Sequence, residues 1–505
     1  MRTNKLLSIT KYAVIGAFVL GLASCAKENK PNPDFTVGPN INFFALTEDN
    51  RLSLINAQTG PVDGQLAITG LQTGEKILSI DFRPATGQLY GLGSTSRIYI
   101  INFNTGVARA VNSTPFTPAL SGTLANLDFN PVVDRIRVVT NTGQNLRINP
   151  ETGEVASVDQ AIAATNKIAS IAYSDNKAGA VAAILYDIDA ATDKLYRQEP
   201  ANSGTLVAVG DLGVDAEEGG GFDVGPDGTA LAAINIAGKS TLVTINGNTG
   251  KTTKIGSFST KLADIAIPTD PVSYVIGPDN QFVIYNPNTG STTTFAVTGL
   301  QPGENILGID MRPLNGQIYA LGSTSRLYTL NAASGAATVV NGGTVFSTPL
   351  SGTSFGFDFN PTVDMIRVVS NTGQNLRINP TTADLTSVDA ALNPGIPSIV
   401  SIAYHNNYAG ALNSTLYDID SQTDMLYKQD PPNDGKLVPV GQLNIDITAT
   451  GGFDIGGTSN LAYGIFTTSD GKTKFYNVNL STGATTAGRD FPLNNIRGFT
   501  VGLGF

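Results

Sequence analysis

The sequence predicts an all-β protein: a tandem β-propeller of two five-bladed rings, in which each blade is a four-stranded antiparallel sheet. Three observations support this prediction. The second half of the chain nearly repeats the first, a short turn motif recurs ten times, and no segment shows the apolar period of an amphipathic helix. The 55 glycines also fit many short strands joined by tight turns.

The duplication is nearly free of insertions. The segment NTGQNLRINP at 141–150 recurs unchanged at 371–380, a shift of 230 residues. The segment LYGLGSTSR at 89–97 matches IYALGSTSR at 318–326, and LYDID at 185–189 recurs at 416–420. These shifts are 229 and 231 residues, so the two halves keep almost the same length. We therefore expect two domains, at 41–269 and 270–505.

Each half contains a shorter repeat that ends in a turn. The turn has the form N-x-x-[ST]-G, and Asn and Gly are the residues favoured where a turn needs positive φ. Between turns, residues 77–111 show the pattern of four short strands, at 77–82, 89–92, 98–101 and 107–111, which is typical of a propeller blade. The turns end at Gly60, Gly106, Gly153, Gly250, Gly290, Gly335 and Gly483, with Ala383 in a diverged copy and looser versions at Gly204 and Gly435.

Two ways of completing the first blade remain open from the sequence. The first unit, 43–68, has three strands and lacks an inner one, and LADIAI at 262–267 fits the missing strand. The segment 499–505 fits the same role in the second half. This interpretation gives two five-bladed rings. The alternative is a single ten-bladed ring, in which 262–267 pairs onward with 274–276 and 499–505 pairs with 43–46.

One long motif carries a family resemblance. The segments FNPVVDRIRVVTNTGQNLRINP at 129–150 and FNPTVDMIRVVSNTGQNLRINP at 359–380 resemble the core motif of the bacterial domain-of-unknown-function family 4394. Each half is similar to one such domain. The resemblance implies a propeller-like fold in which one half closes alone, and it implies no functional residues. Met365 stands where the first half has Arg135, a small departure between the copies.

The first 40 residues read as an export signal and a tether. Arg2, Lys5 and Lys11 give a positive start, and the apolar stretch 12–22 is too short to span a membrane. The following LASC at 22–25 resembles a lipoprotein signal, so we expect cleavage of residues 1–24 and lipidation of Cys25. Residues 25–40 read as a flexible tether. Because Ala26 follows the cysteine, sorting rules favour the outer membrane, and the side faced stays open.

Charge excludes one class of partner. Removal of the three basic residues in 1–24 leaves 28 Lys and Arg against 41 Asp and Glu, a net charge of −13. Nucleic-acid affinity depends on Lys and Arg contacts to phosphate, so an acidic chain without a basic patch is not expected to bind nucleic acid. The expected partners are the membrane, through the lipid anchor, and a glycan or an envelope protein.

Missing residue types also limit the chemistry. Cys25 is the only cysteine and His405 the only histidine, and Ser174 stands in the place of His405 in the first half. A catalytic triad that uses histidine is therefore restricted to one half at most. Zinc, copper or haem ligation of the usual His and Cys type is excluded. We expect His405 to be a surface or strand-end residue, and we assign no catalytic residue.

Carboxylates are the remaining candidates for metal binding. We expect one set to lie near the ends of the innermost strands. These carboxylates either face a central channel and bind Ca²⁺, or accept hydrogen bonds from backbone N–H groups at the strand ends. A second set forms i, i+2 pairs on one strand face, as half of a Ca²⁺ site, a glycosidase pair or part of a polar turn. The first set is Asp81, Asp128, Asp223, Asp310, Asp358 and Asp454, and the second, our candidate metal ligands, is Asp187, Asp189, Asp418 and Asp420.

The loops between the second and third strands are the candidate ligand-binding sites. Their amides, hydroxyls and arginines suit a carbohydrate or a peptide. The alternative is that the same groups only satisfy the backbone of the bend. The candidates are Ser94, Ser96, Arg97, Asn141, Gln144, Asn145 and Arg147, with counterparts Ser323, Ser325, Arg326, Asn371, Gln374, Asn375 and Arg377.

The sequence therefore predicts a lipid-anchored envelope protein that acts as a non-enzymatic binding or scaffold module for a glycan or a protein partner. The alternative is a carboxylate-based or Ca²⁺-assisted polysaccharide hydrolase or lyase. We favour binding because no acid/base pair stands apart from its turn and the chain has no tryptophan. No cofactor is expected other than Ca²⁺ at the carboxylates.

Overall fold

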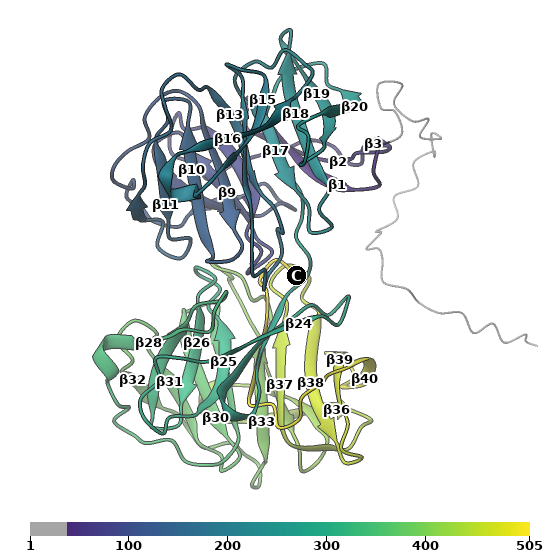
Figure 1. Cartoon of the computed structure of the whole chain (residues 1–505). Helices are drawn as coiled ribbons and strands as arrows, with labels where there is room; N and C mark the ends of the chain where they lie inside the picture. The colour runs from purple at the N-terminus through teal and green to yellow at the C-terminus, as the bar shows by residue number, and fades with distance from the viewer. Residues whose placement is uncertain (1–37) are drawn as a thin grey trace, which may run out of the picture.

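The computed structural model describes residues 38–505. The predicted signal peptide, the predicted lipidation site Cys25 and most of the predicted tether therefore lie outside the described residues. Strands arranged in ten separate sheets make up two domains, one above the other in Figure 1. The only helical segments in 38–505 are four 3₁₀ turns, η1 (Ala201–Ser203), η2 (Pro278–Asn280), η3 (Val340–Gly343) and η4 (Pro432–Asp434).

The first domain contains five sheets, in the orders β21-β1-β2-β3 with β4 also on β2, β5 to β8, β9 to β12, β13 to β16 and β17 to β20. All of their pairings are antiparallel. The strands are β1 (Asn42–Thr47), β2 (Arg51–Asn56), β3 (Gly60–Pro61), β4 (Leu66–Ala67), β5 (Ile77–Phe82), β6 (Leu89–Gly93), β7 (Arg97–Ile101), β8 (Ala108–Ala110), β9 (Ala125–Asn130), β10 (Arg135–Thr140), β11 (Asn145–Ile148), β12 (Val155–Val158), β13 (Ile168–Tyr173), β14 (Leu185–Asp189), β15 (Lys194–Gln198), β16 (Leu206–Asp211), β17 (Gly220–Val224), β18 (Ala230–Ile236), β19 (Lys239–Ile245), β20 (Thr252–Ser257) and β21 (Leu262–Ala266).

The second domain repeats this plan, with sheets β24-β23-β22-β41, β25 to β28, β29 to β32, β33 to β36 and β37 to β40. Its strands are β22 (Ser273–Ile276), β23 (Gln281–Tyr285), β24 (Thr292–Ala296), β25 (Ile306–Met311), β26 (Ile318–Gly322), β27 (Arg326–Leu330), β28 (Ala337–Val339), β29 (Phe355–Asn360), β30 (Met365–Ser370), β31 (Asn375–Ile378), β32 (Leu385–Val388), β33 (Ile399–Tyr404), β34 (Leu416–Asp420), β35 (Met425–Gln429), β36 (Leu437–Gln442), β37 (Ile447–Ile455), β38 (Ala462–Thr468), β39 (Thr473–Val478), β40 (Thr485–Asp490) and β41 (Gly498–Val501).

The last strand of each half supplies the inner strand of that half's first sheet. β21 pairs with β1, with Phe44 opposite Ala266, and β41 pairs with β22, with Tyr274 opposite Thr500. Around the first domain the innermost strands are neighbours in the order β21, β5, β9, β13, β17 and back to β21, and β41, β25, β29, β33 and β37 do the same in the second. The prediction of two five-bladed propellers is confirmed, and the ten-bladed alternative is wrong.

The recurring turn motif has a direct structural explanation. The side-chain oxygen of Asn102 accepts hydrogen bonds from the backbone N–H groups of Asn104 and Thr105, at 3.0 and 3.1 Å. Gly106 then takes a φ of +74°, which glycine adopts without steric cost. The motif therefore connects the third strand of a sheet to the fourth. The same asparagine arrangement occurs at Asn56, Asn149, Asn246, Asn286, Asn331, Asn379 and Asn479.

The hydrophobic core lies between neighbouring sheets. Tyr90 of β6 and Phe129 of β9 are fully buried and meet edge to face, with ring centroids 5.1 Å apart. The equivalent pair in the second domain, Tyr319 and Phe359, has a centroid distance of 5.2 Å. Such pairs stabilise packing beyond their buried area. They fix the spacing of adjacent sheets and hence the position of the innermost strands.

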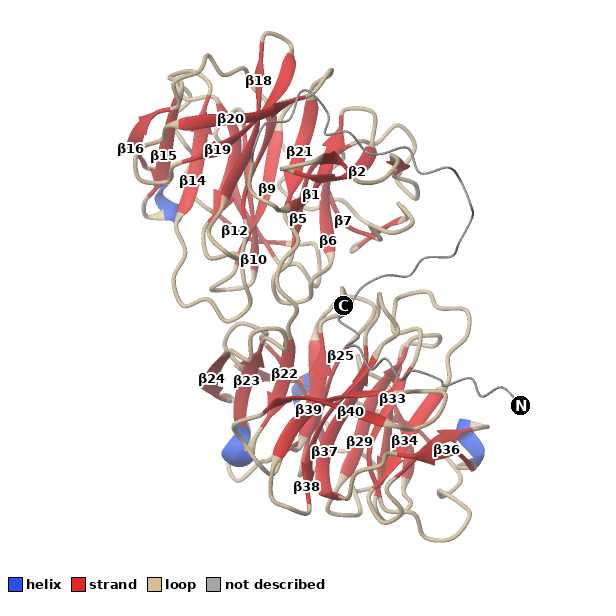
Figure 2. Cartoon of the chain, turned by 90° about the vertical axis from the view of Figure 1, so that its right-hand side faces the viewer, coloured by secondary structure: helices blue, strands red, loops and turns tan. Residues whose placement is uncertain are grey.

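The two domains meet at a waist where the C-terminus also lies (Figures 1 and 2). The Tyr274 hydroxyl donates a hydrogen bond to the Ala85 carbonyl at 2.9 Å, and Gly504 N–H donates to the Thr86 carbonyl at 2.8 Å. The ring of Phe505 lies so close to Gly87 that a Cβ there would be 2.5 Å from the ring. The waist is therefore a specific contact. No helix in residues 38–505 has the length and apolar character needed to span a membrane.

Candidate functional site

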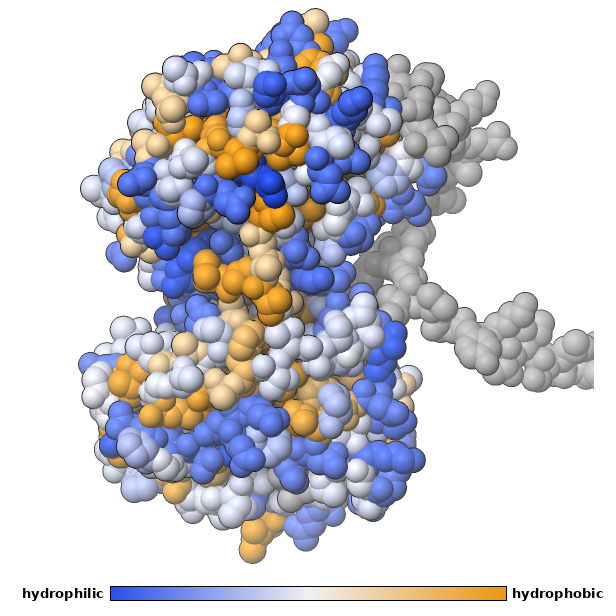
Figure 3. Space-filling view, viewed as in Figure 1, coloured by the Kyte–Doolittle hydropathy of each residue, from blue (hydrophilic) through white to orange (hydrophobic). Residues whose placement is uncertain are grey.

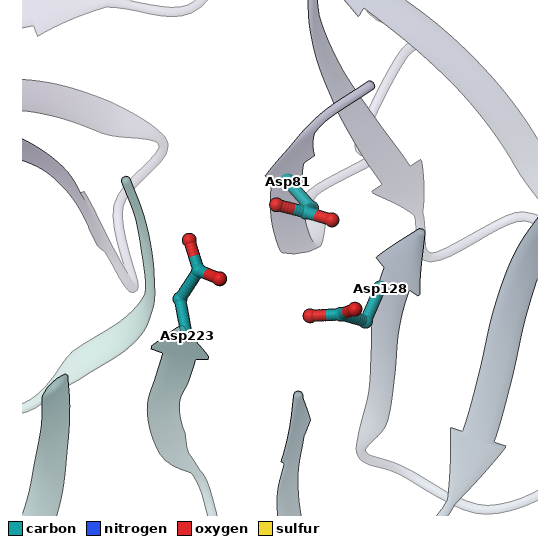
Figure 4. A group of neighbouring side chains, drawn as sticks. All are labelled: Asp81, Asp128 and Asp223. Carbon is teal, nitrogen blue, oxygen red and sulfur yellow. The ribbon is translucent and has the colours of Figure 1, made fainter. Parts of the chain in front are cut away.

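Three aspartates of the first domain converge at its centre. Asp81, Asp128 and Asp223 lie on β5, β9 and β17, each one or two residues before the last residue of its strand. One carboxylate oxygen from each lies within 4.8 Å of those of the other two, and each residue is at most 2% exposed. Figure 4 shows the three side chains turned toward a common space. We call this group the first triad.

The second domain contains an equivalent group, which we call the second triad. Asp310 on β25, Asp358 on β29 and Asp454 on β37 satisfy the same 4.8 Å limit and are at most 1% exposed. The sequence predicted that these residues lie at strand ends near a channel. The close approach of three carboxylates in each domain follows from the curvature of the ring, which brings together residues 47–144 positions apart.

The carboxylates also connect neighbouring strands. Asp81 Oδ1 accepts a hydrogen bond from its own neighbour Phe82 N–H at 2.7 Å, and its Oδ2 accepts one from Phe129 N–H on β9 at 2.8 Å. Asp128 Oδ1 in turn accepts from Tyr173 N–H on β13 at 2.9 Å. The second triad repeats these contacts. Each aspartate thus joins its strand to the next one, which agrees with the backbone-bonding alternative and extends it across blades.

The fourth blade of each domain has no aspartate at this level and provides an amide in its place. Its inner strand carries Ala172 or Ala403, and a buried asparagine follows in the loop, Asn176 or Asn407. Asn176 Nδ2 lies 3.4 Å from Asp223 Oδ1. Asn407 Nδ2 donates to the carbonyl of Ile455, the residue after Asp454, at 3.3 Å. Sequence reasoning missed both asparagines, because they lie beyond the strand and are not among the strand-end aspartates that it singled out.

The closing strands make the two triads chemically different. In the first domain Asp264 on β21 accepts hydrogen bonds from Ser79 Oγ and from Ile80 N–H, the latter at 2.9 Å. In the second domain Thr500 on β41 donates its hydroxyl to Asp454 at 2.9 Å or to Asp310 at 3.1 Å. A fourth carboxyl therefore lies near the first triad, and a hydroxyl lies within the second.

Burial raises the pKa of every triad carboxyl. Desolvation is the main cause for Asp81, Asp128, Asp310 and Asp358, whose pKa values lie well above the usual range, and the neighbouring carboxylates raise them further. Desolvation raises the pKa of Asp223 to about 6, against the effect of its backbone hydrogen bonds. Desolvation likewise raises the pKa of Asp454 to about 7 and the pKa of Asp264 to about 8, again against their backbone hydrogen bonds.

In each i, i+2 carboxylate pair, one aspartate is hydrogen-bonded in a turn and the other is buried without a partner. Asp189 accepts hydrogen bonds from Lys167 N–H at 2.6 Å and from Thr192 Oγ1 at 2.8 Å, as a turn residue does. Both oxygens of Asp187 are buried without a hydrogen-bond partner, and burial raises its pKa well above the usual range. Asp418 and Asp420 repeat this division. Neither pair belongs to a group of three described acidic side chains close enough to share an ion.

The first loop predicted to bind a ligand uses its polar groups locally. Ser94 Oγ accepts from Lys76 N–H at 3.0 Å, and Ser96 Oγ accepts from Leu120 N–H at 2.9 Å. The Arg97 guanidinium donates to Thr95 Oγ1 at 2.5 Å. In the second domain Ser323, Ser325 and Arg326 make the corresponding contacts.

The side chains of the second predicted loop are bonded within their blade and to the loops of later blades, where Asn141 Nδ2 donates to Glu218 at 3.0 Å and Asn145 Nδ2 to the Ala201 carbonyl at 3.3 Å. Asn141 Oδ1 accepts from Thr123 N–H at 3.2 Å, and Gln144 Oε1 accepts from Ser121 N–H at 2.9 Å. The deeper side chains Asn145 and Arg147 contact the buried pair Arg137 and Asp159, respectively. Asn371, Gln374, Asn375 and Arg377 repeat these contacts. Ligand binding at these loops stays a prediction.

A cavity of about 590 Å³ lies at the waist, and we call it the waist groove. Both domains line it, and none of its described lining residues is Asp or Glu. In Figure 3 the surface narrows between the domains and exposes apolar residues there. The lining includes Gln88, Leu89, Ile100, Asn102, Phe103, Thr105, Val107 and Arg109 from the first domain and Pro313, Asn407, Tyr408, Ala409, Thr458 and Leu503 from the second.

His405 occupies the strand end that the sequence predicted. It follows β33, and its Nδ1 accepts a hydrogen bond from Thr415 N–H at 2.9 Å. Burial lowers the pKa of the imidazole. Its ring nitrogen therefore supports the loop that returns to β34.

A family model described as a domain of unknown function, DUF4394, matches residues 51–266 and again residues 281–500. The chain belongs to this family. The two matches coincide with the two propellers, so each DUF4394 domain is one five-bladed unit with its own aspartate triad. None of the curated proteins compared with the chain is similar to it.

Several solved structures are distantly similar to the pair of DUF4394 domains. An extracellular domain assigned to a hybrid two component system of B. thetaiotaomicron is 10% identical, covering 91% of this chain and 66% of its own, with a TM-score of 0.25. PorZ, a surface component of the type-IX secretion system of Porphyromonas gingivalis, is 14% identical, and the match covers 90% of this chain and 58% of PorZ, with a TM-score of 0.24. Sqt1 of Saccharomyces cerevisiae is 11% identical, and the match covers 80% of this chain and 96% of Sqt1, with a TM-score of 0.25. The chain thus spans less than two thirds of the first two.

Proposed function

We propose that the protein is a lipid-anchored envelope protein that binds a glycan, without cleaving it, in the waist groove between its two DUF4394 domains. The N-terminal signal pattern and Cys25 support the envelope location. The observation that carries the proposal is the groove itself, at about 590 Å³. That volume lies within the range of about 300–1,000 Å³ that is usual for ligand sites.

The lining of the groove suits a neutral sugar. Gln88 and Asn102 bring amides, and Arg109 brings a guanidinium held by the Leu314 carbonyl of the other domain at 2.5 Å. Tyr408 is 46% exposed and presents an aromatic surface. Amides and a guanidinium pair with hydroxyls, while an aromatic ring provides an apolar face with a polar tip.

The positions of the carboxylates favour binding over hydrolysis. A glycosidase needs two carboxyl groups on either side of the bond that it cleaves. Neither of two other cavities, of about 390 and 290 Å³, is lined by more than one described acidic residue, Asp270 and Asp364 respectively. The six triad aspartates are buried and bonded to the backbone. They are therefore poorly placed to reach a polysaccharide.

A glycan array and a pull-down from envelope extracts, both with the full-length chain, test the proposal. We expect saturable binding to a glycan class, and we expect Tyr408→Ala to weaken it at least tenfold. The matched control is Leu412→Ala, because Leu412 lies on the same loop, is 95% exposed and does not line the groove. Capture of a protein without any glycan signal would favour the protein-partner version. Silence in both assays would contradict the binding function.

A further inference from the structure

The geometry of each triad permits one shared ion. Two oxygens bound to the same Ca²⁺ at 2.3–2.6 Å are at most about 5 Å apart. One oxygen from each aspartate of the first triad lies within 4.8 Å of those of the other two, and the same holds for the second triad. Each carboxylate is fixed on a different inner strand and held by backbone N–H groups. The triad positions are therefore set by the ring and need no rearrangement.

A second, independent feature lies beside each triad. Asn176 and Asn407 are fully buried, and the side-chain oxygen of each has no hydrogen-bond partner among the described residues. The hydrogen bond places Asn176 Nδ2 3.4 Å from Asp223 Oδ1, and turning the amide over exchanges Nδ2 with Oδ1, which brings the oxygen to face the first triad. A buried acceptor without a partner destabilises the fold, so such groups usually have a ligand, a water or an ion. Amide oxygens are common Ca²⁺ ligands.

Oxygens on the triads are also left unused. Asp128 Oδ1 accepts from Tyr173 N–H, and its Oδ2 receives no hydrogen bond from the described residues. Asp358 is bonded in the same way, through Oδ1 to Tyr404 N–H at 2.9 Å. No described Lys or Arg forms an ion pair with any triad aspartate. Three buried carboxylates without a cationic partner are costly, and either protons or a metal ion must offset that cost.

We propose that each DUF4394 domain binds one Ca²⁺ ion at its triad, with the three carboxylates and the amide oxygen of Asn176 or Asn407 as ligands. The ligand set contains only oxygen, which suits hard cations. Ca²⁺ accepts irregular shells of six to eight ligands, whereas Mg²⁺ demands near-ideal octahedral geometry and keeps its waters. The triad carboxylates are fixed on strands and also accept hydrogen bonds from backbone N–H groups, so they cannot easily adopt ideal octahedral geometry. The site therefore favours Ca²⁺ over Mg²⁺.

The two sites differ in their neighbouring groups and in access. Asp264 adds a carboxyl near the first triad, whereas Thr500 donates a hydroxyl within the second. Asn407 also lines the waist groove, so the ion enters the second site from that groove. This inference does not depend on glycan binding, since the two ligands occupy different places.

Calcium titration of the full-length chain, freed of metal by chelation, tests the inference. We expect two Ca²⁺ per chain by equilibrium dialysis, with Mg²⁺ binding at least tenfold more weakly. Asp128→Asn leaves one ion, and Asp128→Asn combined with Asp358→Asn leaves none. The substitution keeps Oδ1 as an acceptor for Tyr173 N–H, so the blade contact is retained. Asp187→Asn is the control, because this carboxyl is equally buried but lies outside the triads, and it keeps both ions.

Thermal unfolding of the unaltered chain gives a second measurement that needs no variant. Ca²⁺ at 100 times its Kd is expected to raise Tm by about 5–10 °C relative to the chelated protein. A chain that binds no Ca²⁺ at millimolar concentration and shows no shift in Tm would overturn the inference, and the triads would then share protons. Two ions retained by the double variant would overturn it as well.

Discussion

Asp187 and Asp189 are neighbours on one strand face, and their substitution is expected to have opposite effects. Both oxygens of Asp187 are buried without partners, and its pKa is raised chiefly by burial. Asp187→Asn removes the ionisable group and keeps the shape of the side chain. A buried polar group without a partner costs about 1–3 kcal/mol, and more when it is charged. Because the amide still lacks partners, we expect a gain of about 1–2 kcal/mol at pH 7.

The pH dependence of this gain distinguishes its cause. The pKa of Asp187 is higher in the folded chain than in the unfolded chain, so the folded state binds more protons between those two values. The stability that this proton contributes is complete below the unfolded pKa of about 4 and is lost as pH rises through the folded pKa. The gain from Asp187→Asn should therefore be close to zero below pH 4 and largest at neutral pH.

Thermal unfolding at pH 4 and pH 7, followed by circular dichroism, measures this effect. For a domain of this size the gain corresponds to a rise in Tm of about 2–8 °C at pH 7. The control is Asp189→Asn, which weakens hydrogen bonds from Lys167 N–H and Thr192 Oγ1 and should cost about 1–3 kcal/mol. If Asp187→Asn destabilises the chain, or if its effect does not vary with pH, the carboxylate has a partner and the reasoning is refuted.

Two further substitutions test the blade contacts and the waist. Asp159 forms ion pairs with Arg137, at 2.7 Å, and with Arg147, and these lower the pKa of its carboxyl against the effect of burial. The stability that this carboxylate contributes is therefore present above pH 4 and is lost as pH falls through the folded pKa. In urea unfolding, Asp159→Asn should cost about 3 kcal/mol at pH 7 and little at pH 2. Phe505→Ala removes the ring that covers Gly87 and should split one calorimetric transition into two; a single unchanged transition would show that the ring does not couple the domains.

Much of the fold could be predicted because local chemistry repeats in the sequence. The predicted strand at 77–82 has the observed bounds of β5, and the missing inner strand at 262–267 is β21 with one residue fewer. The turn residues Asn and Gly have fixed local roles, so they appear as a motif. The ring closure was ambiguous because the same segment, β21, is adjacent in sequence to β22. Only the pairing of β21 with β1 decides between the two arrangements.

The candidate sites were harder to predict, because they depend on contacts between blades. Strand ends carrying aspartate were visible in the sequence, but their convergence depends on the curvature of the ring. Asn176 recurs in the second half as Asn407 but is not part of the pattern shared from blade to blade, and its place beside Asp223 follows from packing of neighbouring blades. Residues such as Gln144 looked free, yet the bend of their own blade uses them. The waist groove has no local sequence pattern, because its walls come from segments about 200 or more residues apart.

The central claim is that the chain binds a glycan at the waist without cleaving it, and one paired measurement tests this most directly. The full-length chain is incubated with the best glycan from the array, and bound ligand and newly formed reducing ends are measured in the same samples. The account predicts saturable binding that Tyr408→Ala weakens at least tenfold, with no reducing ends above those of the buffer. Release of reducing ends that Asp270→Asn or Asp364→Asn abolishes would contradict it.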